Sequence, residues 1–342
     1  MGSARPVAAV VGSNSLLGRE VRDVLAGTPF QRKLIGADEI EAGTLTEEGG
    51  EPLVITALDE ENLAAAQAVF LAGSAESSSR AMEIVSKLRS RPMVVDLTYA
   101  LEDRPTAHLR APVVEPAGYV LPPGSEHVVA HPAAILLALF LVRLGQAGPI
   151  RRVIAHVFEP ASERGQRGID ELQRQTVNLL TFQKLPKGVY DEQAAFNLLA
   201  RYGAEAPLSM ESIETRIERH LATLLALNGG IHMPSLRLIQ APVFHGHSVS
   251  LWAEFETDPG VRALEQALAS AHIDVRGADV EAPNAVGMAG QSGIAVGAIA
   301  PDRNDARAVW FWVAADNLRI AAENAVAVAQ PLAGAAGAGT TQ

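Results

Sequence analysis

The sequence of 342 residues contains no cysteine. Disulfides, thiolate metal sites and cysteine nucleophiles are therefore excluded. Long apolar stretches are also missing, because the longest, Ala133 to Val142, is far shorter than the ~20 residues that span a bilayer. The start of the chain, Met1 to Val11, has a single Arg and lacks the apolar region and cleavage site of a signal peptide. We therefore expect a cytoplasmic protein that does not act at a membrane.

Basic residues are in the minority, with 28 Lys and Arg against 39 Asp and Glu and a net charge of −11. Nucleic acids and anionic membranes bind basic patches, so neither is an expected partner. Hydrophobic residues make up 48% of the chain and charged residues 20%, which is typical of a globular protein. A chain of this length exceeds one ordinary hydrophobic core and predicts two domains.

The first 130 residues alternate short apolar runs with helical patterns. A helical pattern follows the first run through Leu25, and another follows the third run from about Ser77 to Ser90. Alternation of this kind indicates βαβ units and a parallel sheet, as in a Rossmann-type dinucleotide-binding domain. The four runs expected as strands are Pro6–Val11, Arg32–Gly36, Ala68–Ala72 and Pro92–Asp96.

The pattern beyond residue 130 is that of an α+β domain. A strongly apolar helix is expected at Pro132–Leu144, with its proline in the first turn. Further helices are expected at 168–180, 212–227 and 317–330, and strands at 152–157, 237–241, 248–255 and 309–313. We therefore assign 1–130, completed by a C-terminal helix at 316–332, to the first domain, 131–315 to the second, and 333–342 to a flexible tail.

The first strand leads into a glycine-containing turn, Gly12-Ser13-Asn14-Ser15-Leu16-Leu17-Gly18. Gly12 would permit the tight turn, and Gly18 the close helix–strand contact of a dinucleotide site. Backbone N–H groups at the helix start would face a pyrophosphate. Ser15 replaces the glycine that lets the backbone approach phosphate, although its hydroxyl could donate a hydrogen bond. An ordinary strand–helix turn is the equally open alternative.

Five segments, in one order along nearly the whole chain, resemble the aspartate-semialdehyde dehydrogenase family. Its signature "ADNLR" matches Ala315 to Arg319, and "R-x-P-V-x-x-G-H-S" is similar to the stretch from Gln240 to Ser248. Its "S-G-A-G-x-x-G-x-x-E-L" is similar to Ser162–Leu172, and the shorter "A-F-N" and "V-P-E-V" are similar to 195–197 and 113–116. The resemblance implies that family's two-domain fold, with an α+β domain for catalysis and dimerisation.

The departures from the family pattern gather at its active site. The nucleophilic cysteine falls on Ala133, the glutamine that places the thioester on Glu159, and the arginine that clamps the substrate carboxylate on Gln240. A phosphate-binding arginine falls near Leu101, and the base histidine is retained as His247. The pattern thus resembles the family's cysteine-less paralogues, the USG-type proteins. Arg237 lies three positions before Gln240, so on a strand it points to the opposite face and is a poor substitute.

The family's chemistry needs a thiolate that attacks the substrate carbonyl, and an alanine methyl has no lone pair for this. We therefore predict a pseudoenzyme that retains nucleotide binding without the standard dehydrogenase activity. The alternative is an NAD(P)-dependent oxidoreductase acting on an aldehyde or oxo group without a covalent intermediate, using His247 and Glu159. Glu159 is equally open as a carboxylate bonded to Arg164 or His247. His245 and His247 lack an evident third ligand, so no metal is expected.

A nucleotide, if bound, is expected to be NAD rather than NADP, and weakly held. Asp38, 20 positions after Gly18, would accept hydrogen bonds from ribose hydroxyls and repel a 2′-phosphate. The residues expected at the nucleotide are Gly12, Asn14, Ser15, Leu16, Leu17, Gly18, Asp38, Gly73 and Asn317.

A symmetric homodimer built on the second domain is also expected. The resemblance supplies one reason, and amphipathic helices with more apolar surface than one sheet face covers supply another. The apolar surface in question is the segment Val177–Phe182 and the helix residues Ile213, Ile217, Leu221, Leu224 and Leu225.

Overall fold

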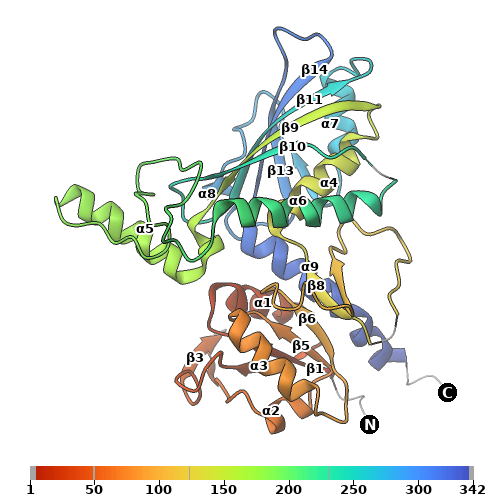
Figure 1. Cartoon of the computed structure of the whole chain (residues 1–342). Helices are drawn as coiled ribbons and strands as arrows, with labels where there is room; N and C mark the ends of the chain where they lie inside the picture. The colour runs from red at the N-terminus through yellow and green to blue at the C-terminus, as the bar shows by residue number, and fades with distance from the viewer. Residues whose placement is uncertain (1–4, 49–50, 123, 230, 339–342) are drawn as a thin grey trace. The chain divides into compact units, whose positions relative to one another are not determined.

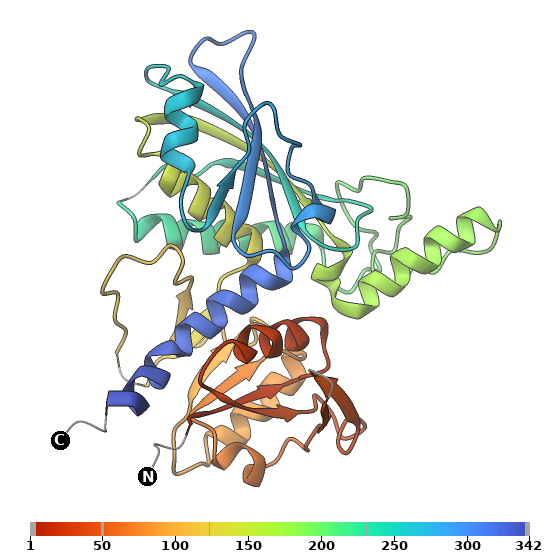
Figure 2. The same cartoon turned by 180° about the vertical axis from the view of Figure 1, so that it is seen from behind.

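The computed structural model describes residues 5–48, 51–122, 124–229 and 231–338. The chain divides into two compact units, each with its own six-stranded sheet. The first unit comprises residues 1–112, 117–130 and 321–342, and the second comprises 113–116 and 131–320. The expected fold class is therefore confirmed: a parallel, Rossmann-like sheet and a mixed sheet with helices (Figures 1 and 2).

The sheet of the first unit is entirely parallel, with strand order β2-β1-β5-β6-β8-β7. Its central strands are apolar and almost entirely buried, as expected for a parallel sheet covered on both faces. The strands are β1 (Val7–Val11), β2 (Gln31–Ile35), β5 (Ala68–Leu71), β6 (Met93–Asp96), β7 (Ala107–Arg110) and β8 (Glu126–Val129).

The helices of this unit begin at capped positions. Asp59 and Ser74 accept hydrogen bonds from the first turns of α2 (Glu60–Ala64) and α3 (Ala75–Val85), and Ser15 does the same for α1 (Leu16–Ala26). A two-stranded hairpin, β3 (Leu45–Glu48) and β4 (Glu51–Val54), was not predicted. Its short strands carry mixed polar residues without a clear alternation, so the sequence offers little signal.

The mixed sheet of the second unit has the order β10-β9-β11-β14-β13-β12. Its strands are β9 (Ile150–Glu159), β10 (Ser235–Gln240), β11 (His247–Phe255), β12 (Ile273–Val275), β13 (Ile294–Pro301) and β14 (Ala308–Ala315). Its helices are α4 (Pro132–Leu144), α5 (Gly165–Leu180), α6 (Met210–Ala226), α7 (Val261–Leu268), α8 (Ala285–Met288) and the short 3-10 turn η1 (Ala161–Arg164).

Helix α4 is the centre of this unit's core. Eleven of its thirteen residues are buried, because a helix that is apolar all round needs neighbours on every side. It packs against α6 and α7, and its Phe140 meets Phe311 of β14 edge to face at 5.2 Å between ring centroids. Helix α5 extends away from the sheet in both views (Figures 1 and 2).

The prediction that α6 offers an apolar face to a partner is wrong. Its apolar residues, among them Ile213, Ile217 and Leu221, are buried within the unit, because α6 packs against α4. The segment 177–182 does carry apolar side chains that are uncovered within one chain, because Val177, Leu180 and Phe182 are exposed.

The C-terminal helix is longer than predicted. Helix α9 (Asn317–Ala338) continues through Pro331, beyond the expected end at 332. The Ala-rich composition of residues 333–338 favours helix more than the glycines oppose it. The rest of the predicted tail, 339–342, lies outside the described residues.

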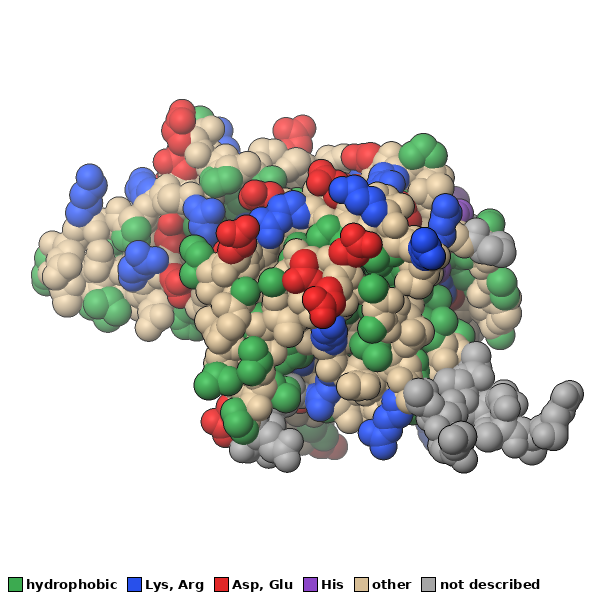
Figure 3. Space-filling model, turned by 90° about the horizontal axis from the view of Figure 1, so that it is seen from below, with side chains coloured by type: hydrophobic (Ala, Val, Ile, Leu, Met, Phe, Trp, Pro, Cys, Tyr) green, Lys and Arg blue, Asp and Glu red, His purple; other side chains and the backbone are tan. Residues whose placement is uncertain are grey.

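Acidic and basic side chains are interspersed on the face shown in Figure 3. Within the part of the chain that the structure describes, no helix is both long and apolar enough to cross a membrane.

Candidate functional site

The glycine turn of the first unit is closely packed. Gly12 has a φ of +76°, and a Cβ there would lie 2.2 Å from the Cα of Gly73. A Cβ on Gly18 would lie 2.1 Å from the carbonyl oxygen of Gly12. Gly12 and Gly18 therefore require glycine for the packing of β1, β5 and α1, whatever the turn binds.

Ser15 lies at the N-terminus of α1, and its hydroxyl is engaged by the protein itself. The hydroxyl donates to the carbonyl oxygen of Ala72 at 2.6 Å and accepts from the N–H of Gly18 at 2.8 Å. It is thus a helix cap rather than a hydroxyl turned toward a phosphate. Asn14, Leu16 and Leu17 remain partly exposed around it.

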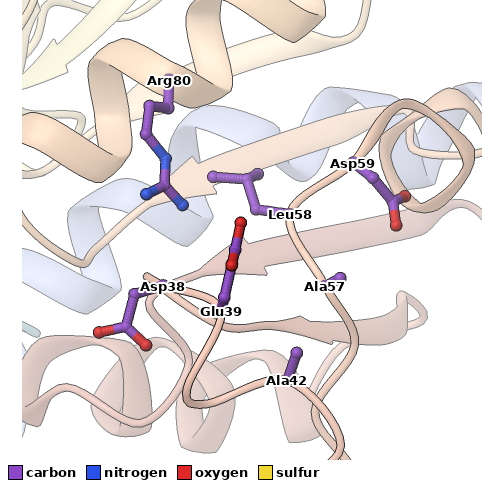
Figure 4. Close-up of a pocket in the computed structure, with 7 residues that line it drawn as sticks. All are labelled: Asp38, Glu39, Ala42, Ala57, Leu58, Asp59 and Arg80. Carbon is purple, nitrogen blue, oxygen red and sulfur yellow. The ribbon is translucent and has the colours of Figure 1, made fainter.

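A cavity of about 620 Å³ lies beside Asp38 (Figure 4). Asp38 uses one carboxylate oxygen to accept from the N–H groups of Ile40 and Glu41, at 3.0 and 3.1 Å. Arg80 reaches the same cavity from α3 and donates to the carbonyl oxygen of Ala37 at 3.2 Å. Sequence reasoning missed Arg80, because nothing in the local pattern of α3 links it to a loop much earlier in the chain. The cavity is lined by Asp38, Glu39, Ala42, Ala57, Leu58, Asp59 and Arg80.

Ala133, where the sequence resemblance places the family's nucleophile, lies in the first turn of α4 and is fully buried. Its N–H donates to Nδ1 of His131 at 3.2 Å, while the N–H of His131 donates to Nδ1 of His220 at 2.9 Å. Because Nδ1 of His131 accepts, the proton of the neutral ring is on Nε2. Burial, followed by the neighbouring His247 and His220, holds the pKa of His131 well below its usual range.

Glu159 ends β9 and forms a buried ion pair with Arg164. The distance from Nη2 of Arg164 to Oε1 of Glu159 is 2.5 Å, and the two side chains are 10% and 0% exposed. Of the two open alternatives for Glu159, the geometry is thus that of a carboxylate bonded to Arg164. Burial raises the pKa of Glu159 and Arg164 opposes the rise. Burial disfavours the guanidinium of Arg164, but Glu159, Tyr202 and Glu163 together outweigh this, and the pKa of Arg164 is raised.

Glu163 supplies a second buried carboxyl group, which sequence reasoning missed. It accepts from Nδ2 of Asn317 at 2.8 Å and lies 3.5 Å from Nε2 of His131. Its other imidazole neighbour is His247, at 4.0 Å. Burial raises the pKa of Glu163. A signal was present in the sequence, because Glu163 and Arg164 fall on the glycine and alanine of the family's "S-G-A-G".

His247, the retained histidine, begins β11 beside this group. Its ring centroid is 6.0 Å from that of His131, and its Nε2 is buried without a hydrogen-bond partner among the described residues. Burial lowers the pKa of His247 to about 4, against a smaller opposing effect of Glu159. The ring is therefore neutral near pH 7 and could accept or donate a proton.

Gln240, where the family has its substrate arginine, is locked in place. Its Oε1 accepts from the hydroxyl of Tyr202 at 2.6 Å, and its Nε2 donates to the carbonyl oxygens of Glu159 and Ala241 at 2.9 and 3.0 Å. The Arg237 side chain is 65% exposed whereas Gln240 is buried, as expected for alternating positions of a strand. Leu101 is buried, and its N–H donates to Asp96.

Asn317, expected at the nucleotide, connects three segments of the second unit. Its Oδ1 accepts from the Ser162 hydroxyl and from the N–H of Gly246, each at 3.0 Å, and its Nδ2 donates to Glu163. Within the described residues, no group of three or more His, Cys, Asp or Glu side chains is arranged to hold a metal ion. The titratable side chains around His131 and His247 include those of Glu159 and Glu163, and the alanine at position 133 has no nucleophilic atom.

Residues 141–320 match the family model described as "Semialdehyde dehydrogenase, dimerisation domain". This chain belongs to the semialdehyde dehydrogenase family. It is 26% identical to the aspartate-semialdehyde dehydrogenase of Rickettsia bellii, over 95% of this chain and 96% of that protein. It is 29% identical to the USG-1 protein homolog of Pseudomonas aeruginosa, with 95% and 96% covered. The predicted family and its USG-type relation are confirmed.

Solved structures agree with this family assignment. A probable aspartate-semialdehyde dehydrogenase from Pseudomonas aeruginosa superimposes with a TM-score of 0.82 at 28% identity, covering 96% of this chain and 98% of that one. The Candida albicans aspartate semialdehyde dehydrogenase with NADP, at 16% identity and a TM-score of 0.69, shares the fold over 98% and 99% of the two chains.

The glycine turn generates a prediction about stability. Gly12→Ala should cost about 3 kcal/mol or more, because a left-handed φ and a backbone clash add. Gly43→Ala is the matched control, since Gly43 has a φ of +82° with nothing within 4 Å of the position a Cβ would take, and should cost only about 1 kcal/mol. Urea unfolding measures both, and equal losses would contradict the close packing.

The buried histidine generates a prediction about pH. Because the pKa of His247 is lower in the folded chain, its contribution to stability is present above about pH 6.5 and is lost as the pH falls toward 4. The loss should approach about 3 kcal/mol. The raised pKa values of Glu159 and Glu163 act in the opposite direction, losing stability as pH rises above about 4.5.

Unfolding free energies between pH 4.5 and 8 separate these effects. His247→Gln should flatten the acid limb, whereas the exposed His232→Gln should leave it as in the wild type. An unchanged acid limb in His247→Gln would show that another group governs the pH dependence.

Proposed function

We propose that this chain is a semialdehyde dehydrogenase family member that binds a nucleotide weakly and lacks the family's thiol-based dehydrogenase activity. The first unit would be the nucleotide-binding domain and the second the dimerisation domain. One observation carries the proposal: the buried first turn of α4 presents Ala133 in the centre that holds His131 and His247, in a chain without any cysteine. Losing a nucleophile can cost ~10⁶ in rate where catalytic residues act as a unit.

The surroundings of Ala133 support the same proposal. An acyl phosphate or aspartate semialdehyde carries negative charge and needs a cationic anchor, preferably a guanidinium free to bind it. Gln240 is neutral and fully engaged, and Arg164 is already paired with Glu159. Among its described residues, the centre therefore has no nucleophile to attack the family's substrate and no free cation to bind its negative charge.

The proposed function predicts that no aspartate-semialdehyde oxidation is measurable with phosphate and NADP. Ala133→Cys alone should not restore it, because Gln240 and Leu101 leave the substrate without its anchors. The assay follows NADPH absorbance, with a cysteine-containing relative as the positive control. Robust turnover by the wild type would overturn the proposal.

The second prediction concerns the nucleotide. NAD should bind more tightly than NADP, because the cavity beside Asp38 holds three carboxylates against the single guanidinium of Arg80. Binding should be weak, since the Ser15 hydroxyl is turned to Ala72 and not to the pyrophosphate. Titration calorimetry measures the affinity for each nucleotide. Asp38→Asn should reduce the preference for NAD over NADP, and Arg80→Ala should increase it. Tighter binding of NADP by the wild type would refute the role of Asp38.

The third prediction is a homodimer formed by the second unit. Exposed apolar side chains remain on and beside α5 and on strands of the mixed sheet, including Leu180, Phe182, Ile154 and Trp310. A second copy would bury them, with more than ~2,000 Å² if the dimer is obligate. Light scattering should give twice the chain mass, and Phe182→Asp should lower it, whereas a monomeric wild type at micromolar concentration would refute the dimer.

A second candidate function is an oxidoreductase without a covalent intermediate. The Nε2 of His247 favours it, because this atom makes no hydrogen bond within the described residues and is available for proton transfer. Its acid partner would be Glu163 rather than Glu159, because Glu159 is held by Arg164 and Glu163 lies between two imidazoles. NAD consumption with a panel of aldehydes, absent in His247→Gln, is the result that would establish it.

A further inference from the structure

The ion pair between Glu159 and Arg164 leaves part of each group unused. The contact joins Nη2 to Oε1, so one nitrogen of the guanidinium and one carboxylate oxygen take part. Oε2 of Glu159 and Nε of Arg164 are buried without a hydrogen-bond partner among the described residues, as is Nε2 of His247. Buried polar atoms are nearly always paired, so three in one cluster require an explanation.

The three atoms have complementary hydrogen-bonding capacities. Oε2 of Glu159 accepts, Nε–H of Arg164 donates, and Nε2 of His247 does either according to its tautomer. They come from the end of β9, from η1 and from the start of β11, in the same buried centre as His131 and Ala133. A small molecule with both a donor and an acceptor carries hydrogen-bonding groups complementary to these atoms.

The charges of the centre decide which small molecule fits. Arg164 provides one positive charge, which Glu159 compensates, and Glu163 adds a second carboxyl group. Arg216 acts electrostatically on His131 and Asp316 on His247, so one further charge of each sign lies within range. Both nearby imidazoles, His131 and His247, are neutral near pH 7 because burial lowers their pKa values. An entering carboxylate would meet two carboxyl groups and a guanidinium that is already neutralised, which is unfavourable in a buried site.

We propose that Glu159 is a resident counter-ion of Arg164, so that the centre beside Ala133 binds a small uncharged molecule with a donor and an acceptor and rejects carboxylates. Primary amides and hydroxy compounds belong to this class. The inference rests on the proposed function, since it names the ligand class of the same centre. Glu159 is then the residue that determines the charge selectivity of the site.

Acetamide and acetate are matched probes, because they share size and shape and differ in charge. Ligand-observed NMR measures their binding to the full-length wild type, to Glu159→Gln and to the double variant Glu159→Gln/Arg164→Gln. The wild type should bind acetamide at least about tenfold more tightly than acetate. Glu159→Gln frees the guanidinium and should reverse the order, and the double variant should lose the acquired acetate binding.

Wild-type binding of acetate as tightly as acetamide, or of neither probe, would overturn the inference. Failure of Glu159→Gln to gain acetate binding would overturn the counter-ion role. If Glu159→Gln folds only when acetate is present, that dependence supports the counter-ion role of Glu159. If it folds with neither probe, the relative affinity of the wild type for acetamide and acetate decides the inference. Aspartate-semialdehyde turnover by the wild type would instead defeat the proposed function, so the two failures are distinguishable.

Discussion

The pairing of Glu159 with Arg164 is the constraint on which the second unit's centre depends. A carboxylate and a guanidinium are buried together at the end of β9, and each would be costly there without the other. The pair lies in one centre with Glu163, His247 and Gln240, and Gln240 bonds the end of β10 to the end of β9. The opposite charges of Glu159 and Arg164 therefore compensate each other within the chain.

In the proposed function, the semialdehyde dehydrogenase fold persists with Ala133 at the position of the family's nucleophile. Ala133 still lies in the first turn of the apolar helix α4, which needs only its capping histidine and its buried neighbours. Asn317 joins the start of the last helix to Ser162 and Gly246, with Glu163 as a further partner. The scaffold depends on packing and on this network, whereas the thiol chemistry depends on one side chain that the scaffold does not require.

Periodicity predicted four strands of each sheet, because these strands are apolar or bury one face. The apolar helix from Pro132 to Leu144 was predicted to the residue, since a proline marks its first turn and a glycine follows its last. The hairpin β3–β4, the sheet strands β7, β8, β12 and β13, and the extension of α9 were not predicted, because their patterns are short or weak. Burial of the α6 residues within the unit also depends on tertiary packing against α4, which local spacing does not reveal.

The site was predictable only in part. The motif order located Ala133, Glu159, Gln240 and His247, which the structure places in the second unit, but the partner of each side chain depends on distances between strands. Glu163 occupies a position where the family motif has a small residue, and its role follows only from the two imidazoles that the fold brings near it. Arg80 reaches the cavity beside Asp38 from a distant segment, and no sequence spacing encodes that approach.

A double-mutant cycle on Glu159 and Arg164 tests the central claim most directly. Unfolding free energies of the wild type, Glu159→Gln, Arg164→Gln and the double variant give the coupling between the two charges. The account predicts single losses of about 3 to 5 kcal/mol, with the double variant within about 1 kcal/mol of the wild type. Additive losses, with a coupling below about 0.5 kcal/mol, would contradict the claim that the two residues neutralise each other at the centre.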